Sequence, residues 1–221
     1  MTPADELIVR IGAGQVADGS SGKRAAIVLA ATELFLAKGY DGASTDQIAA
    51  AASVSKQTVY NQFGDKQTLF HEIILGVTAT AEQFAAGLPA SVAAVRAPED
   101  LEPALRELAR RYLAAVMNPR VLALRRLMIG EAHRFPQLAA DYYERGPTHV
   151  LAALADVFER LSLRGLLAAA DPTVTAEHFA YLVLGRPLDR GMFDVDAAPS
   201  VEDLNAAADR AVTFFLAATR P

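Results

Sequence analysis

The sequence predicts an all-helical, all-α protein of about nine helices, and three observations support that fold class. Apolar residues recur at spacings of three and four through most of the chain, as expected for helices with one buried face. No run of alternating apolar and polar residues bounded by turn residues indicates a strand. Residues 44–63, STDQIAAAASVSKQTVYNQF, contain two helix-start signals separated by a short turn.

Composition narrows the class of protein. The chain has 221 residues, enough for one larger or two smaller domains. No apolar stretch of about 18 residues runs without a charge or a glycine, so we expect no membrane-spanning segment. The absence of Cys excludes disulfides and thiolate metal sites and is compatible with a cytoplasmic location. The net charge of −5 argues against a polyanionic partner, yet all four lysines lie before residue 67, so one face can be locally positive.

The first helix of the central motif begins at a capping box. Ser44 precedes an apolar run and has Gln47 three residues later, so each side chain can satisfy a free amide at the helix start. We expect a short helix from Thr45, with Ile48 on its buried side. A turn at residues 53–54 should end it.

A second short helix should follow that turn. Ser55 can cap it, and Val59 and Phe63, four residues apart, give it an apolar stripe. Four polar side chains are then left facing outward: Lys56, Gln57, Thr58 and Asn61. This arrangement predicts a helix-turn-helix.

The outward residues suit the major groove of DNA. Lys can bond guanine, Asn or Gln can pair with adenine, and a Thr methyl can touch the thymine methyl. Lys56 and Lys66 each lie in the first turn of a predicted helix, where a cation opposes the helix dipole and phosphate is favoured. Together these features predict double-stranded DNA as a partner. The alternative is that both lysines are solvated surface residues.

Residues 23–70 resemble the DNA-binding domain of TetR-family (tetracycline-repressor-like) transcriptional regulators. An amphipathic first helix carries the resemblance together with Phe35, Gly39, Tyr40, Ser44, Ile48, Ala49, Val54, Ser55, Thr58, Tyr60, Phe63, Lys66, Leu69 and Phe70. One departure is Ser53, because the family most often has Gly in this turn. A left-handed conformation would strain Ser there by about 1 kcal/mol.

The resemblance implies roles for particular residues. In the family the second helix reads bases, residues matching Tyr60 and Lys66 hold phosphates, and the start of the preceding helix touches the DNA backbone. The predicted DNA-binding residues are Lys23, Ser44, Thr45, Ser55, Lys56, Gln57, Thr58, Tyr60, Asn61, Gln62 and Lys66.

The chain divides into three predicted regions. Residues 1–22, rich in Gly and Ser, are expected to form a mobile arm. Residues 23–70 form the helix-turn-helix domain, whose first helix should end at Gly39. Residues 71–221 form a helical effector-binding and dimerisation domain, in which Gly146 and Pro147 should break or kink a helix.

The last two predicted helices indicate a dimer. Residues 179–184, FAYLVL, are apolar all round, and the final helix has a stripe rich in small residues. Paired with their two-fold copies they would make a four-helix bundle, as TetR-family members usually do. The predicted interface residues are Phe179, Leu182, Val183, Leu204, Ala208, Ala211, Val212 and Phe215. The alternative is that both helices complete the core of one chain.

Residues 124–147 resemble the C-terminal domain of AefR-like TetR regulators. That resemblance implies a pocket for an unknown small-molecule effector among the middle helices. Its predicted lining comprises Phe84, Met117, Leu124, Arg125, Met128, His133, Tyr142 and Phe158. For each of them, an ordinary core or surface position is the alternative.

Two other classes of function remain open from the sequence. A helical enzyme would need an acid–base or metal constellation, but His71, His133, His149 and His178 form no HExxH spacing, and no GxSxG elbow or phosphate-binding glycine loop occurs. We therefore expect no catalysis, metal or cofactor. A helical protein-interaction module without DNA binding is the second alternative.

Overall fold

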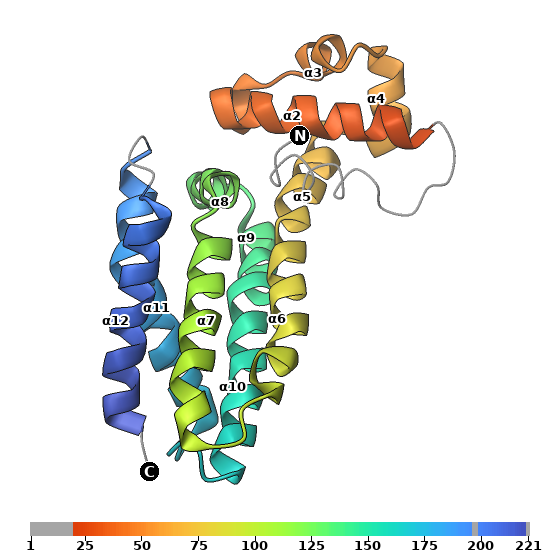
Figure 1. Ribbon diagram of the computed structural model, residues 1–221. Coiled ribbons are helices and arrows are strands. Elements are labelled where there is room, and N and C mark those ends of the chain that lie inside the picture. Colours follow the sequence, from red (N-terminus) through yellow and green to blue (C-terminus); the bar gives the residue numbers. More distant parts are fainter. Residues whose placement is uncertain (1–19, 196–198, 220–221) are drawn as a thin grey trace. The chain divides into compact units, whose positions relative to one another are not determined.

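The computed structural model describes residues 20–195 and 199–219, and every regular element in these ranges is helical (Figure 1). The elements are α2 (Ser20–Gly42), α3 (Thr45–Ala51), α4 (Lys56–Phe63), α5 (Lys66–Gly76), α6 (Thr78–Ala93), α7 (Pro98–Val116), α8 (Pro119–Glu131), α9 (Pro136–Tyr143), the π-helical turn η1 (Glu144–Thr148), α10 (His149–Leu163), α11 (Pro172–Phe193) and α12 (Val201–Thr219). Because α5 and α6 form one run, and α9, η1 and α10 another, the described residues make nine continuous helical runs. The all-helical prediction is confirmed.

The chain forms two compact units. The first runs to Ala79 and also includes Ala123–Tyr143, so it holds α2 to α5, most of α8, and α9. The second comprises Thr80–Leu122 and Glu144–Pro221. The predicted arm over residues 1–22 falls largely outside the described residues, and its last three residues already belong to α2.

Local capping signals build the helix-turn-helix as predicted. The Ser44 hydroxyl accepts the Gln47 amide at 3.2 Å, and the Gln47 side chain accepts the Ser44 amide at 3.1 Å. At the start of α4 the Ser55 hydroxyl accepts the Thr58 amide at 3.1 Å. The apolar sides of α3 and α4 are buried, with Ile48 fully inaccessible, so the two helices pack together and α3 also packs on α2.

Gly39 interrupts α2, close to where the sequence predicts its end. Its φ of 71° and ψ of 178° break the helix before a last turn formed by residues 40–42. An aromatic cluster closes over this break. The Tyr40 ring meets the Phe70 ring at 5.0 Å, and Phe35 meets Phe70 at 5.1 Å, so the end of α2 is packed on α5.

Ser53 adopts the left-handed backbone that the turn requires. Its φ of 53° makes it the one non-glycine residue with positive φ in the described part of the chain. The helix-turn-helix keeps its geometry despite the departure from Gly, and the turn carries the associated strain.

Replacing Ser53 with Gly is expected to stabilise the protein by about 1 kcal/mol, because Gly adopts positive φ without the Cβ clash. Urea unfolding should show a higher midpoint with an unchanged slope. Ser53→Ala is the control, since it keeps the Cβ and should not gain stability. A Gly variant that is less stable than the wild type would contradict the strain assignment.

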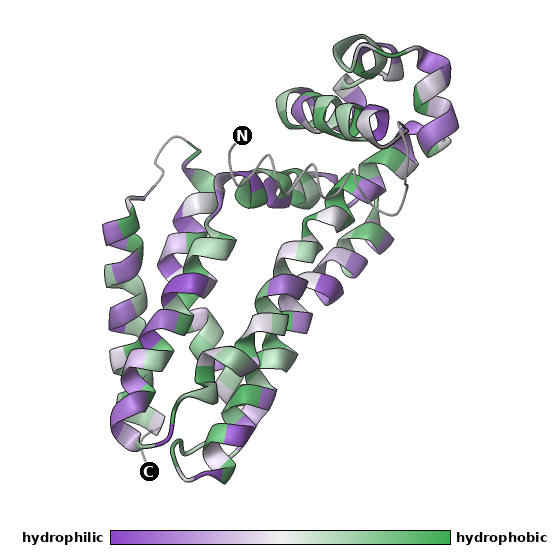
Figure 2. Ribbon diagram, turned by 45° about the vertical axis from the view of Figure 1, so that its right-hand side comes forward, coloured by the Kyte–Doolittle hydropathy of each residue, from purple (hydrophilic) through white to green (hydrophobic). Residues whose placement is uncertain are grey.

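The second unit is a helical bundle with one continuous apolar core. Helix α10 packs on α11, and α12 packs on α7 and α11. The rings of Phe158, Phe179 and Phe215 meet at its centre with centroids 5.1 to 5.5 Å apart. In Figure 2 the helices carry hydrophobic residues on one side and hydrophilic residues on the other, as the periodicity of the sequence predicts.

The helix does not break at Gly146 and Pro147, where the sequence predicts a break or a kink; it changes there into η1, a single π-helical turn between α9 and α10. Proline has no amide hydrogen to donate, so the regular α-helical ladder cannot continue through it. The π turn is wider than an α-helical turn, so the helix continues from α9 into α10.

One helical run, Lys66–Ala93, is long and apolar enough to cross a membrane by length and composition alone. Core helices of soluble proteins meet the same criterion. In the first unit Leu69, Phe70, Ile73 and Ile74 of this run are buried against other helices, so its apolar character serves packing.

Candidate nucleic-acid interface

The outward face of α4 carries the residues predicted to read bases. Lys56, Gln57 and Asn61 are exposed, and Tyr60 is 39% exposed. The Gln57 amide nitrogen donates to the Asn61 side-chain oxygen at 2.9 Å. Because the bond uses the Gln57 nitrogen and the Asn61 oxygen, Oε1 of Gln57 and Nδ2 of Asn61 remain as an acceptor and a donor that match the edge of adenine.

Lys56 does not stand free on this face. Its ammonium donates to Asp46 of α3 at 2.9 Å, and that hydrogen bond raises the pKa of Lys56. The pair ties the starts of α3 and α4 together. Because both side chains are exposed, the pair is weak in water and a DNA phosphate or guanine can compete for the lysine.

Lys66 is held by two backbone carbonyls. Its ammonium donates to Tyr40 O at 2.9 Å and to Ala43 O at 3.0 Å, and it lies 4.1 Å from the centre of the Tyr40 ring. An ammonium has three donors, so one N–H remains without a partner among the described residues. The sequence did not reveal this anchoring, which fixes the lysine between the end of α2 and the start of α3.

The other predicted DNA-binding residues lie on α4 or near its start and on the two helices before it. Ser44, Ser55 and Lys23 are exposed, and Thr45, Thr58 and Gln62 are half-buried. Arg24, which the sequence offers beside Lys23 as a residue that could reach DNA, donates to the Gln62 carbonyl at 2.9 Å, pairs with Glu72 and lies 4.2 Å from the centre of the Phe63 ring. Arg24 therefore fastens the end of α4 to α2 and α5.

Most predicted dimer residues are core residues of a single chain, so the predicted interface needs correction. Five of them are at most 2% exposed: Phe179, Val183, Ala208, Val212 and Phe215. Ala211 is buried as well, Leu204 is half-buried, and only Leu182 is exposed. Phe179, Ala208 and Val212 line neither surface pocket on α11 and α12, so the alternative that they complete one core fits them. Val183, Leu204 and Ala211 line the larger of the two pockets together with Leu182, and Phe215 lines the smaller one.

The same two helices expose a different apolar face. Tyr181, Leu182 and Phe214 are 58%, 39% and 66% exposed. Leu182 and Phe214 line two adjoining pockets of about 730 and 460 Å³ on the surface of α11 and α12. Arg186 and Asp203 are among the residues that line the larger one.

The predicted effector residues do not form one site within either unit. Phe84, Met117 and Phe158 belong to the second unit, and Leu124, Arg125, Met128, His133 and Tyr142 belong to the first. Phe158 is fully buried among aromatic rings, and His133 is exposed to solvent. Phe84 stacks on Tyr112 at 5.0 Å, and Met117 lines the larger α11–α12 pocket. Burial raises the pKa of Tyr142.

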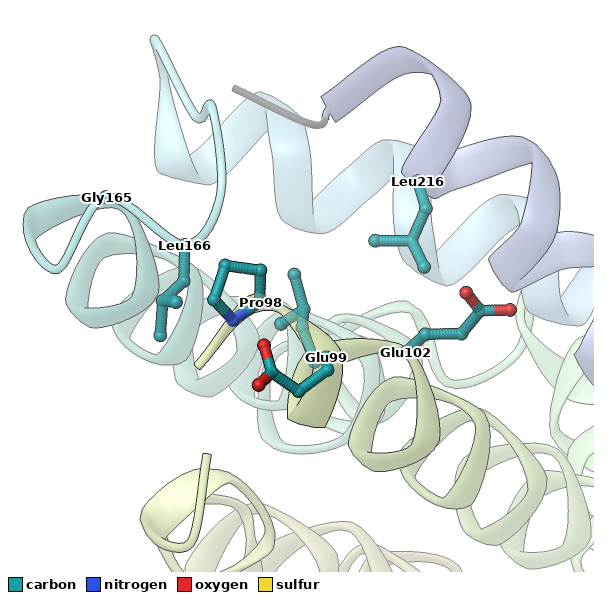
Figure 3. Close-up of a pocket in the computed structure, with 7 residues that line it drawn as sticks. Pro98, Glu99, Glu102, Gly165, Leu166 and Leu216 are labelled. Atoms are coloured by element: carbon teal, nitrogen blue, oxygen red, sulfur yellow. The ribbon is translucent and has the colours of Figure 1, made fainter. Parts of the chain in front are cut away.

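A further surface pocket of about 470 Å³ lies at the start of α7 (Figure 3). Leu166 and Leu216 contribute apolar surface, and Glu99 and Glu102 place carboxylates at its rim. None of the predicted effector residues lines it. Elsewhere in the described ranges, no group of three or more His, Asp or Glu side chains is arranged to hold a metal ion.

Comparison with known proteins identifies both parts of the chain. Residues 27–73 match the family of bacterial regulatory proteins, tetR family, and residues 103–220 match the C-terminal domain of AefR-like transcriptional repressors. No curated protein sequence matches the chain.

Solved structures agree. A protein from Mesorhizobium loti MAFF303099, assigned to the TetR family of transcriptional regulators, is 37% identical over 93% of this chain and 100% of its own, with a TM-score of 0.82. The flavonoid-responsive regulator FrrA is 32% identical over 90% and 97% of the two chains, with a TM-score of 0.69. A TetR transcriptional regulator from Agrobacterium tumefaciens is 25% identical over 92% and 95%, with a TM-score of 0.64. These relatives are regulators and not enzymes, and the chain itself belongs to the TetR family of transcriptional regulators, with an AefR-like C-terminal domain.

Proposed function

We propose that the protein is a cytoplasmic, homodimeric repressor that binds a palindromic operator and is released from it by a small-molecule effector. The observation that carries the proposal is the exposed polar face of α4, where Gln57 and Asn61 are linked and Lys56 lies in the same first turn as Gln57. A helix with such a face fits the major groove, and its N-terminal half is the part that meets base edges.

The residues divide into base readers and backbone contacts. Gln57 and Asn61 present an acceptor and a donor on one side of α4, which suits an adenine edge. Tyr60 and Lys66 have the exposed hydroxyl and the remaining ammonium donor that suit phosphate oxygens. The two groups should therefore respond differently to substitution.

Replacing Tyr60 with Phe or Lys66 with Gln is expected to weaken binding to all DNA sequences and, for Lys66, to lower the salt slope by about 1. Replacing Asn61 with Ala should instead relax base preference by about 1 to 3 kcal/mol at particular positions. Fluorescence anisotropy with the DNA upstream of the protein's own gene, at several salt concentrations, measures both effects. An Asn61→Ala variant that binds and discriminates as the wild type does would remove Asn61 from the reading face.

The exposed apolar residues Tyr181, Leu182 and Phe214 support a dimer through α11 and α12. An apolar patch on the outside of two neighbouring helices can pair with its own two-fold copy. A dimer would carry two α4 helices, and half-sites about 34 to 36 Å apart, or somewhat more, would then form the operator. The proposed dimer still pairs α11 and α12, but its contact face is the one that carries Tyr181, Leu182 and Phe214.

The effector is proposed to act by favouring one arrangement of the protein over another. A ligand shifts such an equilibrium only through different affinities for the two states. FrrA is described as flavonoid-responsive, so flavonoids are the first compounds to test. Operator affinity should fall when a bound compound is present. If no compound that binds the purified protein changes its operator affinity, the proposed switch is wrong.

A further inference from the structure

The corner between α8 and α9, residues 131–135, is part of the DNA-binding unit. Its sequence, EAHRF, lies some 90 residues after the end of α2, and Glu131 nevertheless accepts a hydrogen bond from the Tyr40 amide at 3.2 Å. That amide follows the break at Gly39, where the helix no longer supplies a regular partner. A backbone donor in such a place needs a substitute acceptor, and the Glu131 carboxylate provides it.

Two more side chains of the corner hold the same turn. Arg134 pairs with Asp41 at 2.5 Å and lies 5.3 Å from the centre of the Tyr40 ring. Phe135 is buried, with its ring 4.8 Å from that of Tyr40 and 5.3 Å from that of Phe70. The exposed ion pair contributes little by itself. The ion pair, the buried Phe135 ring and the hydrogen bond to Glu131 together hold the last turn of α2.

This turn supplies a carbonyl that orients Lys66. The ammonium of Lys66 donates to Tyr40 O and lies over the Tyr40 ring, so a shift of Tyr40 moves two of the contacts that aim the lysine. Glu131 and Lys66 thus act on the N–H and the C=O of one residue. No atom of the corner needs to touch DNA for this effect.

We propose that Glu131, Arg134 and Phe135 are positioning residues for operator binding, which act by holding Tyr40 so that the remaining donor of Lys66 meets a DNA phosphate. The inference rests on the proposed DNA-binding function. It assigns part of the operator affinity to a segment that lies inside the match to the AefR-like C-terminal domain, outside the helix-turn-helix itself.

Charge makes the role of Glu131 testable. Removal of a carboxylate from a DNA-binding unit by itself raises the affinity for a polyanion. Loss of the Tyr40 hydrogen bond has the opposite effect, because it shifts Lys66 away from the phosphate and so lowers the affinity for DNA. Glu131→Ala removes both the charge and the bond. Glu131→Gln removes the charge but keeps an acceptor for the Tyr40 amide, so the pair separates the two effects.

The experiment measures operator affinity of the full chain by fluorescence anisotropy across a salt series, with melting followed by circular dichroism. Glu131→Ala is expected to lower affinity about tenfold, the scale of one hydrogen bond to a charged group, and to reduce the salt slope by about 1. Arg134→Ala should act in the same direction and more weakly. Glu131→Gln should bind as well as or better than the wild type. Arg145→Ala, which removes an exposed arginine of η1 that belongs to the second unit, should lose no more than the electrostatic contribution of one surface charge.

Combination with Lys66→Gln decides whether the corner acts through Lys66. On that background Glu131→Ala should cause no further loss, because the contact it positions is already gone. Equal losses on both backgrounds, or a Glu131→Ala variant with wild-type affinity and salt slope, would overturn the inference. So would a loss accompanied by a lower melting temperature and an unchanged slope. A wild-type chain that binds no duplex would instead overturn the proposed function, and this inference with it.

Discussion

Replacing Phe214 with Asp is expected to convert the proposed dimer into a monomer and to lower operator affinity by about 100-fold or more, because two linked half-site contacts would become one. Phe214 is 66% exposed on α12 and lines both pockets beside Leu182. A carboxylate placed there would replace a large apolar contact with a charge that must lose its water in any dimer that uses this face. Light scattering coupled to gel filtration gives the mass, and anisotropy gives the affinity.

Leu163→Asp is the matched control for that experiment. Leu163 is 82% exposed at the end of α10, so the change introduces the same charge on an apolar surface residue outside α11 and α12. It should leave both the mass and the affinity unchanged. A Phe214→Asp variant that remains dimeric would place the interface elsewhere.

Replacing the next residue, Phe215, with Ala is expected to destabilise the fold by about 3 to 5 kcal/mol, since it opens a cavity in the core. Phe215 is 2% exposed, and its ring lies 5.1 Å from Phe179 and 5.5 Å from Phe158. The measurement is urea unfolding in the monomeric Phe214→Asp background, so that dimer dissociation does not contribute. Phe214→Asp alone supplies the reference.

The two neighbours therefore test an exposed and a buried position of one helix. Two results together would contradict the assignment of Phe215 to the core. In the Phe214→Asp background, Phe215→Ala would leave the urea midpoint unchanged. In the chain with Phe214 intact, Phe215→Ala would convert the dimer into a monomer, which would show that Phe215 faces a partner. Loss of stability without loss of dimer mass supports the burial that the structure shows.

Local sequence patterns were enough to predict the fold class and the helix-turn-helix. The caps at Ser44 and Ser55 depend on residues at most a few positions apart, and they appear in the structure as the sequence predicts. The turn also lies at Ser53, as predicted, and Ser53 takes the left-handed conformation in spite of the strain that the sequence indicates there. The outward face of α4 follows from the same periodicity. The interruption at η1 follows from Gly146 and Pro147, whose backbone properties do not depend on distant contacts.

Contacts between distant residues account for what the sequence could not predict. The run FAYLVL is apolar on every side, so its periodicity cannot tell which side meets the chain's own core. Packing decides that Phe179 and Val183 point inward and that Leu182 points outward. The hydrogen bond from Tyr40 to Glu131 joins residues 91 positions apart, and no local pattern marks such a pair.

Selection of bound duplexes from random-sequence DNA by the full-length protein tests the central claim most directly. The account predicts enrichment of a palindrome whose half-site centres lie about one helical turn apart, roughly 34 to 36 Å, or somewhat more. Asn61→Ala should enrich the same spacing with relaxed choice at particular positions of each half-site. Recovery of no common sequence, at salt concentrations where the wild-type chain remains folded, would contradict DNA recognition by α4.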